Sequence, residues 1–283
     1  MKIERFSDKQ LEVLTWWLPS SPHHDLDALI CDGAVRSGKT LCMGLSFVCW
    51  ATFSFDRQQF ALCGKTVTSL RRNLISVLLP LLRSLGFTCV EKLSRNTITI
   101  SFGGRSNTFY LFGGRDEGSA ALIQGVTLAG ILLDEVALMP RSFVEQALAR
   151  CSVPGSRLWF NCNPEGPWHW FYREWILKAE ERRALYLHFT MADNPSLTPE
   201  IVERYERMYS GVFHRRFILG EWVQAEGLIY DFFDESYIRE PPGDRFERFV
   251  ISCDYGTVNP ASFGLWGKQG GVWYRIKEIY YDS

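Results

Sequence analysis

Residues 33–40 read Gly33-Ala34-Val35-Arg36-Ser37-Gly38-Lys39-Thr40 and match every fixed position of the pattern G-x-x-x-x-G-K-[ST]. The apolar run 28–31 before them is typical of a short buried strand, and the apolar segment 41–50 after them predicts a largely buried helix. A loop placed between such a strand and helix directs its backbone N–H groups and the positive end of the helix dipole at one point. The sequence therefore predicts a binding site for a phosphate group.

The fixed positions of this loop each have a physical role in such a site. Gly33 and Gly38 allow the backbone to approach a phosphate closely. Lys39 would place its charge against the β- and γ-phosphates, and the Thr40 hydroxyl would complete the ligand shell of Mg²⁺. Arg36 would lie beside the γ-phosphate and stabilise transition-state charge in cis. We therefore expect ATP and Mg²⁺ as cofactors, all eight loop residues in contact with the nucleotide, and Arg36 and Lys39 as catalytic residues.

Composition limits the classes of protein that the chain can represent. Its 283 residues are 46% hydrophobic, which predicts a globular protein with an ample core. A formal net charge of −1 argues against a constitutive nucleic-acid binder, so contacts with DNA would need local basic clusters or neighbouring subunits. Candidate clusters are Arg71-Arg72, Arg182-Arg183 and Arg215-Arg216, although such pairs also occur on ordinary solvated helix faces.

The sequence also carries information about the compartment. Its eight cysteines contain no C-x-x-C pair and several lie in apolar runs, as expected of reduced core residues. The amino terminus has no signal-peptide apolar region, and the apolar stretches are too short to span a bilayer. We expect a protein of the host-cell cytoplasm that does not contact the membrane.

Alternating patterns predict an α/β fold with a mainly parallel central sheet covered by helices on both faces. Residues 66–85 have helical spacing with a kink at Pro80, and the stretch 168–219 is predicted to be mostly helical. Further short apolar runs predict a strand at 60–64 and an antiparallel insertion with strands at 87–90, 97–102 and 108–112.

A second chemical landmark is the apolar run Gly130-Ile131-Leu132-Leu133, which ends in Asp134 and Glu135. A central strand has this pattern when its carboxyl end faces a nucleotide. Asp134 is then expected to hold Mg²⁺ through water, and Glu135 to orient or deprotonate the attacking water. Such acidic pairs also end ordinary strands, and the complete phosphate loop upstream is what favours the functional interpretation.

The segment 156–164 is another apolar strand pattern, ending in Asn161-Cys162-Asn163-Pro164. Asn161 or Asn163 at a strand end could donate to the γ-phosphate and report whether it is present. An Asx turn explains the same residues equally well, because Asn-Pro is a common turn sequence. Local sequence alone does not decide between the two.

The character of the chain changes after the turn sequence Pro241-Pro242-Gly243. Residues 249–254, 261–266 and 272–281 predict three consecutive strands, the last two joined by a turn at 269–271. Three strands without a covering helix are too few for a domain of normal size. We therefore predict three regions: an ATPase domain at 1–226, a linker at 227–246, and the beginning of an incomplete second domain at 247–283.

Taken in order, these motifs resemble the large subunit of the phage terminase, and most closely its PBSX-like branch. The matching features are the phosphate loop with its internal Arg36, the Asp134-Glu135 strand end, the strand end 161–164, the connector 220–227 and the segment 253–257. The resemblance covers nearly the whole chain. The combination of these features is far more specific than any single motif.

The resemblance implies a RecA-like P-loop ATPase followed by an RNase H-like endonuclease that needs divalent metal. By position it implies that Gln10 recognises adenine, that residues 161–164 couple hydrolysis to DNA movement, and that Asp254 is the first nuclease carboxylate. It further implies a homo-oligomeric ring docked on the portal protein, which receives double-stranded DNA from a small terminase subunit. Two-metal cleavage needs several carboxylates, and we expect the later ones beyond Ser283, so that only the full-length protein would cut DNA.

Other functions remain compatible with a phosphate loop. Another P-loop enzyme, such as a DNA helicase or a small-molecule kinase, is one alternative, although the acidic pair favours activated water over a bound acceptor. A nucleotide-binding assembly subunit without turnover of its own is a second alternative. The sequence does not identify an arginine supplied in trans; Arg115, Arg141 and Arg150 are candidates from their position near the sheet edge.

Overall fold

The computed structural model describes residues 5–224, 237–238, 243, 245–254 and 261–281. The chain forms two compact units, Met1–Glu226 and Gly227–Ser283. Most of the predicted linker at 227–246 lies outside the described residues, as do residues 225–227 of the connector and 255–257 of the later motif. None of the described helices is long and apolar enough to cross a membrane.

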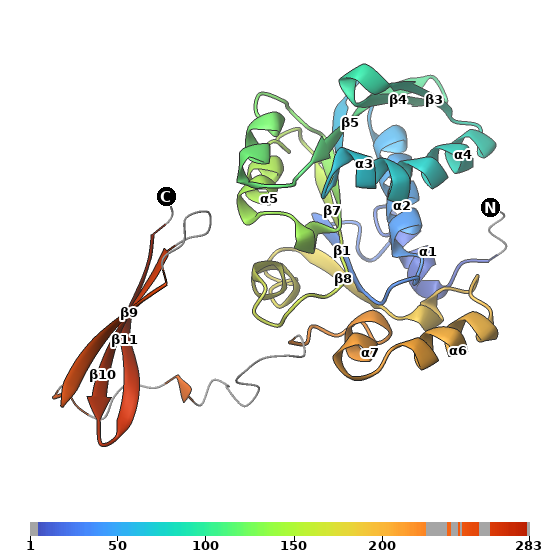
Figure 1. Cartoon of the computed structure of the whole chain (residues 1–283). Coiled ribbons are helices and arrows are strands. Elements are labelled where there is room, and N and C mark those ends of the chain that lie inside the picture. Colours follow the sequence, from blue (N-terminus) through green and yellow to red (C-terminus); the bar gives the residue numbers. More distant parts are fainter. Residues whose placement is uncertain (1–4, 225–236, 239–242, 244, 255–260, 282–283) are drawn as a thin grey trace. The chain divides into compact units, whose positions relative to one another are not determined.

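The first unit is built on an eight-stranded sheet with the strand order β3-β4-β5-β2-β6-β7-β1-β8 (Figure 1). The six strands from β5 to β8 in this order are parallel, and β3 and β4 form an antiparallel extension at one edge. The strands are β1 (Ala28–Gly33), β2 (Gln59–Gly64), β3 (Thr88–Lys92), β4 (Thr97–Phe102), β5 (Arg105–Gly113), β6 (Gly130–Asp134), β7 (Arg157–Asn161) and β8 (Ala184–Phe189). The predicted α/β fold with a mainly parallel sheet is confirmed.

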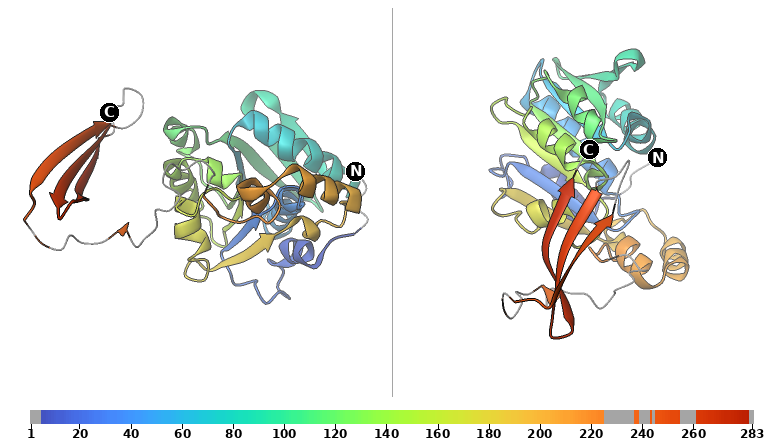
Figure 2. Two further views of the ribbon diagram at one scale, coloured as in Figure 1. Left: turned by 60° about the horizontal axis from the view of Figure 1, so that its bottom comes forward. Right: turned by 60° about the vertical axis from the view of Figure 1, so that its left-hand side comes forward.

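Helices cover both faces of this sheet, as Figures 1 and 2 show. One face is covered by α1 (Asp8–Thr15), α2 (Lys39–Ser54), α3 (Val67–Leu70) and α4 (Ser76–Ser84), and the other by α5 (Arg141–Leu148). Strands β1 and β6 are buried along their whole length because they lie between two helical layers. This burial explains why their sequences are continuous apolar runs instead of alternating ones.

Helix α2 is the central helix of the first layer. It is apolar around its whole circumference, and Phe47, Trp50 and Trp159 of β7 form an aromatic cluster in which ring centroids lie 4.7–5.9 Å apart. Aromatic contacts at these distances add to the free energy gained by burying the rings. The cluster fixes α2 against the sheet, and with it the loop at the start of the helix.

Two predictions about secondary structure were wrong in part. The stretch 168–219 is not mostly helical, because β8 lies within it and pairs in parallel with β1. Charged and turn-forming residues around 180–183 hide this edge strand, and burial of only one part of it weakens its apolar pattern. The remainder contains a π-helical turn (Tyr172–Ile176), α6 (Pro199–Met208) and α7 (Gly211–Phe217).

The predicted helix at 66–85 is present but irregular. Residues Arg71–Ile75 form a π-helical turn between α3 and α4, so the irregularity precedes Pro80, where the kink was expected. The π turn places Asn73 and Val77 beside the loop that begins α2. Such turns inside helices often occur at functional sites.

The second unit contains an antiparallel sheet of three strands in the order β11-β10-β9. Its strands are β9 (Arg248–Asp254), β10 (Ala261–Gln269) and β11 (Val272–Tyr281), which confirms the three predicted strands. Gly270 and Gly271 form the turn between the last two, with φ values of 58° and 81°. Two-residue hairpin turns require such positive values. An RNase H-like fold for this region remains a prediction.

Packing at the start of β6 yields a test of the fold. A Cβ added at Gly130 would lie 2.5 Å from a ring carbon of Trp50 and 3.0 Å from the Arg157 carbonyl oxygen. Because both neighbours belong to the core, we expect Gly130→Ala to lower the free energy of unfolding by about 2 kcal/mol or more. Chemical denaturation measures this change. In the control Gly166→Ala, where a Cβ meets no atom within 4 Å, the change should stay within about 0.5 kcal/mol. Equal stability of the two variants would contradict the packing described here.

Candidate functional site

Three neighbouring parallel strands end at the same edge of the sheet and define the site. These strands are β6, β7 and β1, and they end at Asp134, Asn161 and Gly33. Asp134 and Asn161 are direct register partners, and Asn161 is also the partner of Cys31 on β1. Ligands of open α/β sheets bind at this carboxyl edge. The structure therefore brings the phosphate loop, the acidic strand end and the asparagine strand end together, as the sequence predicts.

The phosphate loop lies tightly against the end of β8. Gly33 has a φ of 118°, and a Cβ there would lie 1.9 Å from the Phe189 carbonyl oxygen, so only glycine fits. The same carbonyl accepts a hydrogen bond of 2.7 Å from the Ala34 N–H group. By contrast, the N–H groups of residues 38–40 have no acceptor among the described residues. These free donors lie at the start of helix α2, and residues 38–40 line the cavity over the loop, where an anion site would use them.

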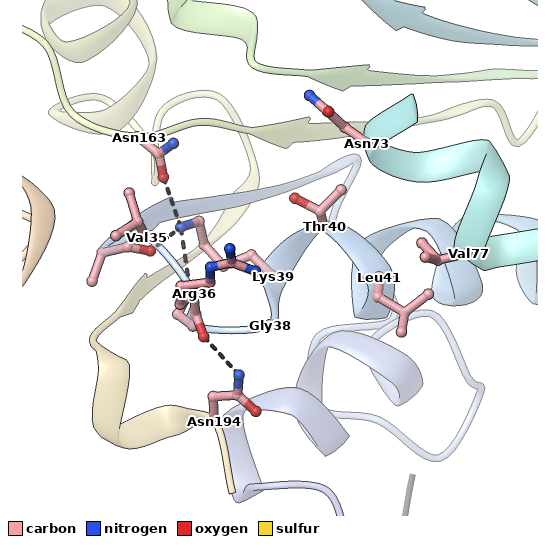
Figure 3. Close-up of a pocket in the computed structure, with 12 residues that line it drawn as sticks. Val35, Arg36, Gly38, Lys39, Thr40, Leu41, Asn73, Val77, Asn163 and Asn194 are labelled. Carbon is pink, nitrogen blue, oxygen red and sulfur yellow. Dashed lines mark hydrogen bonds between the residues drawn. The ribbon is translucent and has the colours of Figure 1, made fainter. Parts of the chain in front are cut away.

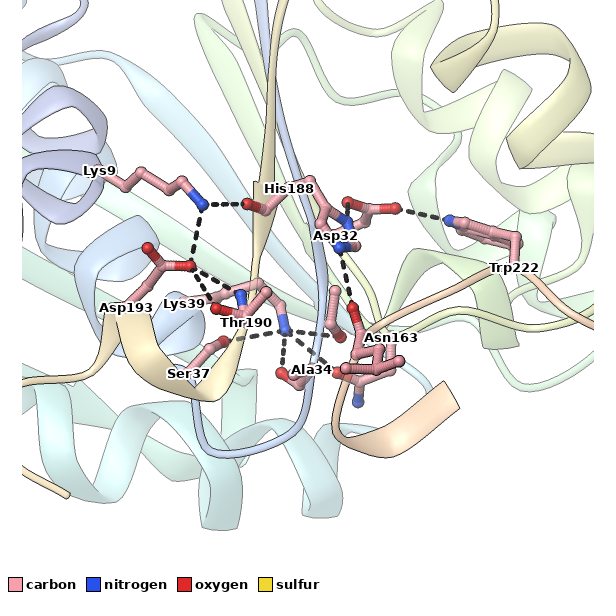
Figure 4. Close-up of polar contacts among 12 residues, drawn as sticks. Lys9, Asp32, Ala34, Ser37, Lys39, Asn163, His188, Thr190, Asp193 and Trp222 are labelled. Atoms are coloured by element: carbon pink, nitrogen blue, oxygen red, sulfur yellow. Dashed lines mark hydrogen bonds and ion pairs between the residues drawn. The ribbon is translucent and has the colours of Figure 1, made fainter. Parts of the chain in front are cut away.

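Lys39 is the most constrained charged residue of the loop. Its Nζ donates to the carbonyl oxygens of Gly33 (3.1 Å) and Ala34 (2.7 Å), to Ser37 Oγ (3.2 Å) and to Asn163 Oδ1 (3.2 Å). Figure 4 shows these contacts. The residue is only 5% exposed, and burial lowers the pKa of Lys39 to about 8. An anionic ligand in the cavity would stabilise the charged form.

Asn161 joins the phosphate loop to the acidic strand. Its Nδ2 donates to Thr40 Oγ1 at 2.9 Å and to Asp134 Oδ1 at 2.5 Å. Its Oδ1 is buried and has no hydrogen-bond partner among the described residues. A buried amide oxygen without a donor is uncommon in proteins and is satisfied when a ligand or water supplies one. Asn161 is therefore placed to respond to what occupies the space between Thr40 and Asp134.

The acidic pair occupies two different environments. Asp134 is 2% exposed, and burial raises the pKa of its carboxyl group to about 6, against the opposing hydrogen bond from Asn161. A cation at this position would reverse that shift. Glu135 has a φ of 62° and its side chain makes no hydrogen bond or ion pair within the described part of the chain. Its carboxylate is therefore free to accept a proton from a ligand.

The Arg36 side chain contacts helix α6. The residue is exposed, and its Nε donates to the hydroxyl of Tyr205 on α6 at 3.3 Å. Its own backbone adopts a φ of 60°, which is unusual for a residue with a Cβ. Asn194 stabilises this conformation by donating from Nδ2 to the Arg36 carbonyl oxygen at 2.6 Å. A role of Arg36 beside the γ-phosphate remains a prediction, and Tyr205 is where the guanidinium rests in this structure.

A cavity of about 340 Å³ opens over the loop (Figure 3). Figure 3 shows Asn163 and Asn194 approaching the loop from different segments, and Asn73 and Val77 from the helix opposite. The volume lies within the usual range for small-molecule sites. The lining residues are Ala34, Val35, Arg36, Ser37, Gly38, Lys39, Thr40, Leu41, Asn73, Val77, Asn163 and Asn194. The sequence analysis missed Asn73, Val77 and Asn194 because their proximity depends on how distant segments fold.

Gln10 lies behind the loop and does not line this cavity. Its amide accepts from the Ser7 N–H group at 3.1 Å and donates to the Ser37 carbonyl oxygen at 3.4 Å. The residue thus caps α1 and touches the loop at the same time. Adenine recognition by Gln10 remains a prediction. Asp254 lies at the end of β9 in the other unit, and the described residues contain no cluster of three or more His, Cys, Asp or Glu that could hold a metal ion.

The most informative residues that the sequence analysis missed surround Asp32. This carboxylate is fully buried one position before the loop. It lies 2.9 Å from His188 Nδ1 and accepts a hydrogen bond of 2.6 Å from Trp222 Nε1 (Figure 4). The hydrogen bond to Asp32 raises the pKa of His188. An acidic residue inside an apolar strand must find partners, so the sequence already indicated that Asp32 has some. It did not indicate His188, because β8 was not recognised, or Trp222, because that residue is distant in the sequence.

The basic clusters considered for DNA contact are largely engaged within the chain. Arg71 pairs with Glu91, Arg183 with Asp27 and Arg215 with Glu221. Arg216 donates to both the Pro164 carbonyl oxygen and Glu165. Of the three candidate trans arginines, Arg141 pairs with Glu145 on the exposed side of α5. These contacts leave the predicted DNA surface unassigned.

Comparisons with known proteins agree with this arrangement. The family model described as terminase large subunit, T4likevirus-type, N-terminal, matches residues 30–237. The large terminase of a thermophilic bacteriophage is 54% identical, with a TM-score of 0.78, and the match covers 99% of this chain and 69% of that one. Structures of the same thermophilic-phage terminase in complex with ADP and with ATP-γ-S give TM-scores of 0.77 and 0.75. No curated protein sequence matches the chain.

A more distant structure agrees in fold alone. The ATPase domain of the large terminase from Thermus phage P74-26 is 18% identical, with a TM-score of 0.53, and the match covers 77% of this chain and 99% of that domain. The narrower PBSX-like branch remains a prediction. The family match over residues 30–237 and the 54% identity to the thermophilic-phage terminase agree with the site geometry: the chain belongs to the family of phage terminase large subunits.

Proposed function

We propose that this chain is the ATP-hydrolysing subunit of a phage DNA-packaging motor. The observation that supports this most directly is the single amide of Asn161, which contacts both Thr40 of the phosphate loop and Asp134 of the acidic strand. One nucleotide can therefore meet both motifs at once. The complexes of the thermophilic-phage terminase with ADP and ATP-γ-S support ATP as the ligand of the cavity.

The donor atoms at the strand edge fit a magnesium ion. Mg²⁺ prefers oxygen ligands, keeps several waters and is usually bound by one or two protein groups together with phosphates. Thr40 Oγ1 and the Asp134 carboxylate share the Asn161 amide and so lie close to one another. They would hold the ion, Thr40 directly and Asp134 through water. When bound, the ion neutralises charge on the β- and γ-phosphates.

Side chains and backbone groups of this chain carry out the remaining steps of nucleotide binding and hydrolysis. Lys39 and the free N–H groups of residues 38–40 bind the phosphates, and Lys39 exchanges some of its present acceptors for phosphate oxygens. Glu135 accepts the proton of the attacking water, since its carboxylate has no partner among the described residues. Arg36 leaves Tyr205 and stabilises the charge that develops on the γ-phosphate.

Asn163 would report hydrolysis to the rest of the molecule. Its Oδ1 accepts from Lys39 Nζ in this structure. A γ-phosphate competes for the same ammonium group, so Asn163 is released when the phosphate binds and recaptured when it leaves. The hydrogen bond between Asn163 and Lys39 supports the sensor interpretation of the 161–164 strand end over a simple Asx turn.

The wider assignment follows the family. We propose that residues 1–226 are the ATPase domain, 227–246 a linker and 247–283 the beginning of a nuclease, in which Asp254 would bind divalent metal. Double-stranded DNA, a small terminase subunit and the portal protein are the proposed partners, with a homo-oligomeric ring on the portal in the host cytoplasm. The motor proposal is tested by adding double-stranded DNA and portal to the full-length protein: hydrolysis should rise, and an unchanged rate would favour a nucleotide-binding assembly role.

Glu135 provides the sharpest test of the chemistry. We expect Glu135→Gln to bind ATP with nearly unchanged affinity and to lose turnover by about a hundredfold or more, because a general base is removed while the phosphate contacts stay. Phosphate release and equilibrium nucleotide binding measure the two effects separately. Glu145→Gln, which alters an exposed carboxylate paired with Arg141, should retain the wild-type rate. Hydrolysis by Glu135→Gln at the wild-type rate would refute the assignment.

Lys39 makes nucleotide affinity depend on pH. Its pKa of about 8 in the free protein is raised when phosphate anions bind, so binding above this pH takes up a proton. The dissociation constant should therefore increase by up to about tenfold per pH unit above this pKa. Calorimetry in buffers of different ionisation enthalpy detects the proton uptake. Lys39→Arg keeps its charge and should show a flat profile; the same slope in that variant would assign the titration to another group.

A further inference from the structure

A short segment that begins at the last residue of α7 touches the phosphate loop directly. We call the segment Phe217–Trp222 the strap. The Val35 N–H group donates to the Phe217 carbonyl oxygen at 3.0 Å. Gly220 has a φ of 73°, and a Cβ there would lie 2.5 Å from Gly33 Cα and 2.6 Å from the Ala34 nitrogen. The two backbones therefore meet with no side chain between them, and a shift of one displaces the other.

Asp32 fastens the strap to the strand that leads into the loop. One oxygen of this buried carboxylate accepts from Trp222 Nε1 at 2.6 Å, and the other lies 2.9 Å from His188 Nδ1. The second ring nitrogen of His188 lies 3.0 Å from the Leu219 carbonyl oxygen. Because both ring nitrogens face acceptors, a protonated imidazole donates to both. Asp32 thus reaches the strap twice, through Trp222 directly and through His188.

The residue before the strap contacts the other loop of the site. Arg216 donates from Nε and Nη2 to the Pro164 carbonyl oxygen, at 3.3 and 3.0 Å, and from Nη2 to Glu165 at 2.6 Å. Pro164 directly follows Asn163, whose amide accepts from Lys39. Residues 216–222 therefore hold the phosphate loop and the asparagine strand end at once.

We propose that the strap is a positioning element for the phosphate loop, with Asp32, His188 and Trp222 as positioning residues. The acceptors of Lys39 include the carbonyl oxygens of Gly33 and Ala34, and these are the backbone units against which Gly220 packs. A displaced strap moves the groups that orient the ammonium. The inference rests on the proposed function in one respect, that the loop binds nucleotide.

The coupling is reciprocal. A ligand that fixes the phosphate loop stabilises the attached strap by the same free energy with which the strap favours the ligand. The chain continues from Trp222 toward the unit Gly227–Ser283. Through the strap, nucleotide binding in the first unit can therefore affect the backbone that leads to the second unit.

Trp222→Phe tests the proposal with little risk to the fold. It removes the indole donor to Asp32 but keeps a ring to stack on Tyr172, whose centroid lies 5.0 Å away. His188→Gln keeps a donor for Leu219 and loses the contact with Asp32. The control Arg215→Gln weakens the exposed pair between Arg215, which precedes the strap, and Glu221 within it, a contact that does not involve the loop.

Hydrogen exchange of individual amides and steady-state hydrolysis are the measurements. In Trp222→Phe and His188→Gln the Val35 amide should exchange roughly tenfold faster, since a hydrogen bond to a charged group is lost. The value of kcat should fall while the melting temperature stays close to that of the wild type. In the wild type we expect ATP-γ-S to slow exchange at residues 217–222, and in the two variants this slowing should be lost. The control should match the wild type throughout.

The possible failures are distinguishable. If both variants match the wild type in Val35 exchange and in kcat, the strap does not position the loop. A lower melting temperature with unchanged Val35 exchange would also overturn the proposal, because it indicates only a structural role. Wild-type protein that binds no ATP-γ-S would refute the proposed function, while exchange of Val35 in the nucleotide-free protein would still decide the role of the strap.

Discussion

The site depends on keeping one buried ammonium group, that of Lys39, charged. Lys39 is held by two backbone carbonyls, a hydroxyl and an amide, and each of them requires a particular path of the chain around it. Burial already lowers the pKa of Lys39, and without these acceptors the group would lose its proton more readily. The loop conformation, the position of Asn163 and the start of α2 all follow from satisfying this one residue.

At the carboxyl edge of the sheet, other buried polar groups also require hydrogen-bond partners. Asp32, Asp134 and Asn161 are buried at the ends of mainly apolar strands. Hydrogen bonds join Asn161 to Asp134 between β7 and β6 and to Thr40 of α2, and His188 pairs with Asp32 between β8 and β1. Buried polar networks specify one arrangement of a core, because alternatives leave donors or acceptors unpaired. Arg36, which rests on the hydroxyl of Tyr205, lies outside this network. It can therefore reorient toward a nucleotide without breaking the sheet edge.

The sequence alone determined the features of this protein that depend on residues close to one another in the chain. The residues 33–40 specify a phosphate loop wherever a strand and a helix flank them, and the apolar runs before Asp134 and Asn161 specify buried strands with polar ends. Such patterns lie within a few residues of one another and depend on backbone conformation and burial alone. The hairpin at 269–271 was predictable for the same reason, because its glycines permit the positive φ of the turn.

Tertiary structure decided which distant groups meet. Edge strand β8 has a weak apolar pattern because part of it is only half buried, and without it His188 has no predictable place beside Asp32. Asn73, Asn194 and Tyr205 approach the loop from segments separated from it by many residues, so no local pattern announces them. Contacts of this kind are fixed by strand order and helix packing, which a single sequence does not display.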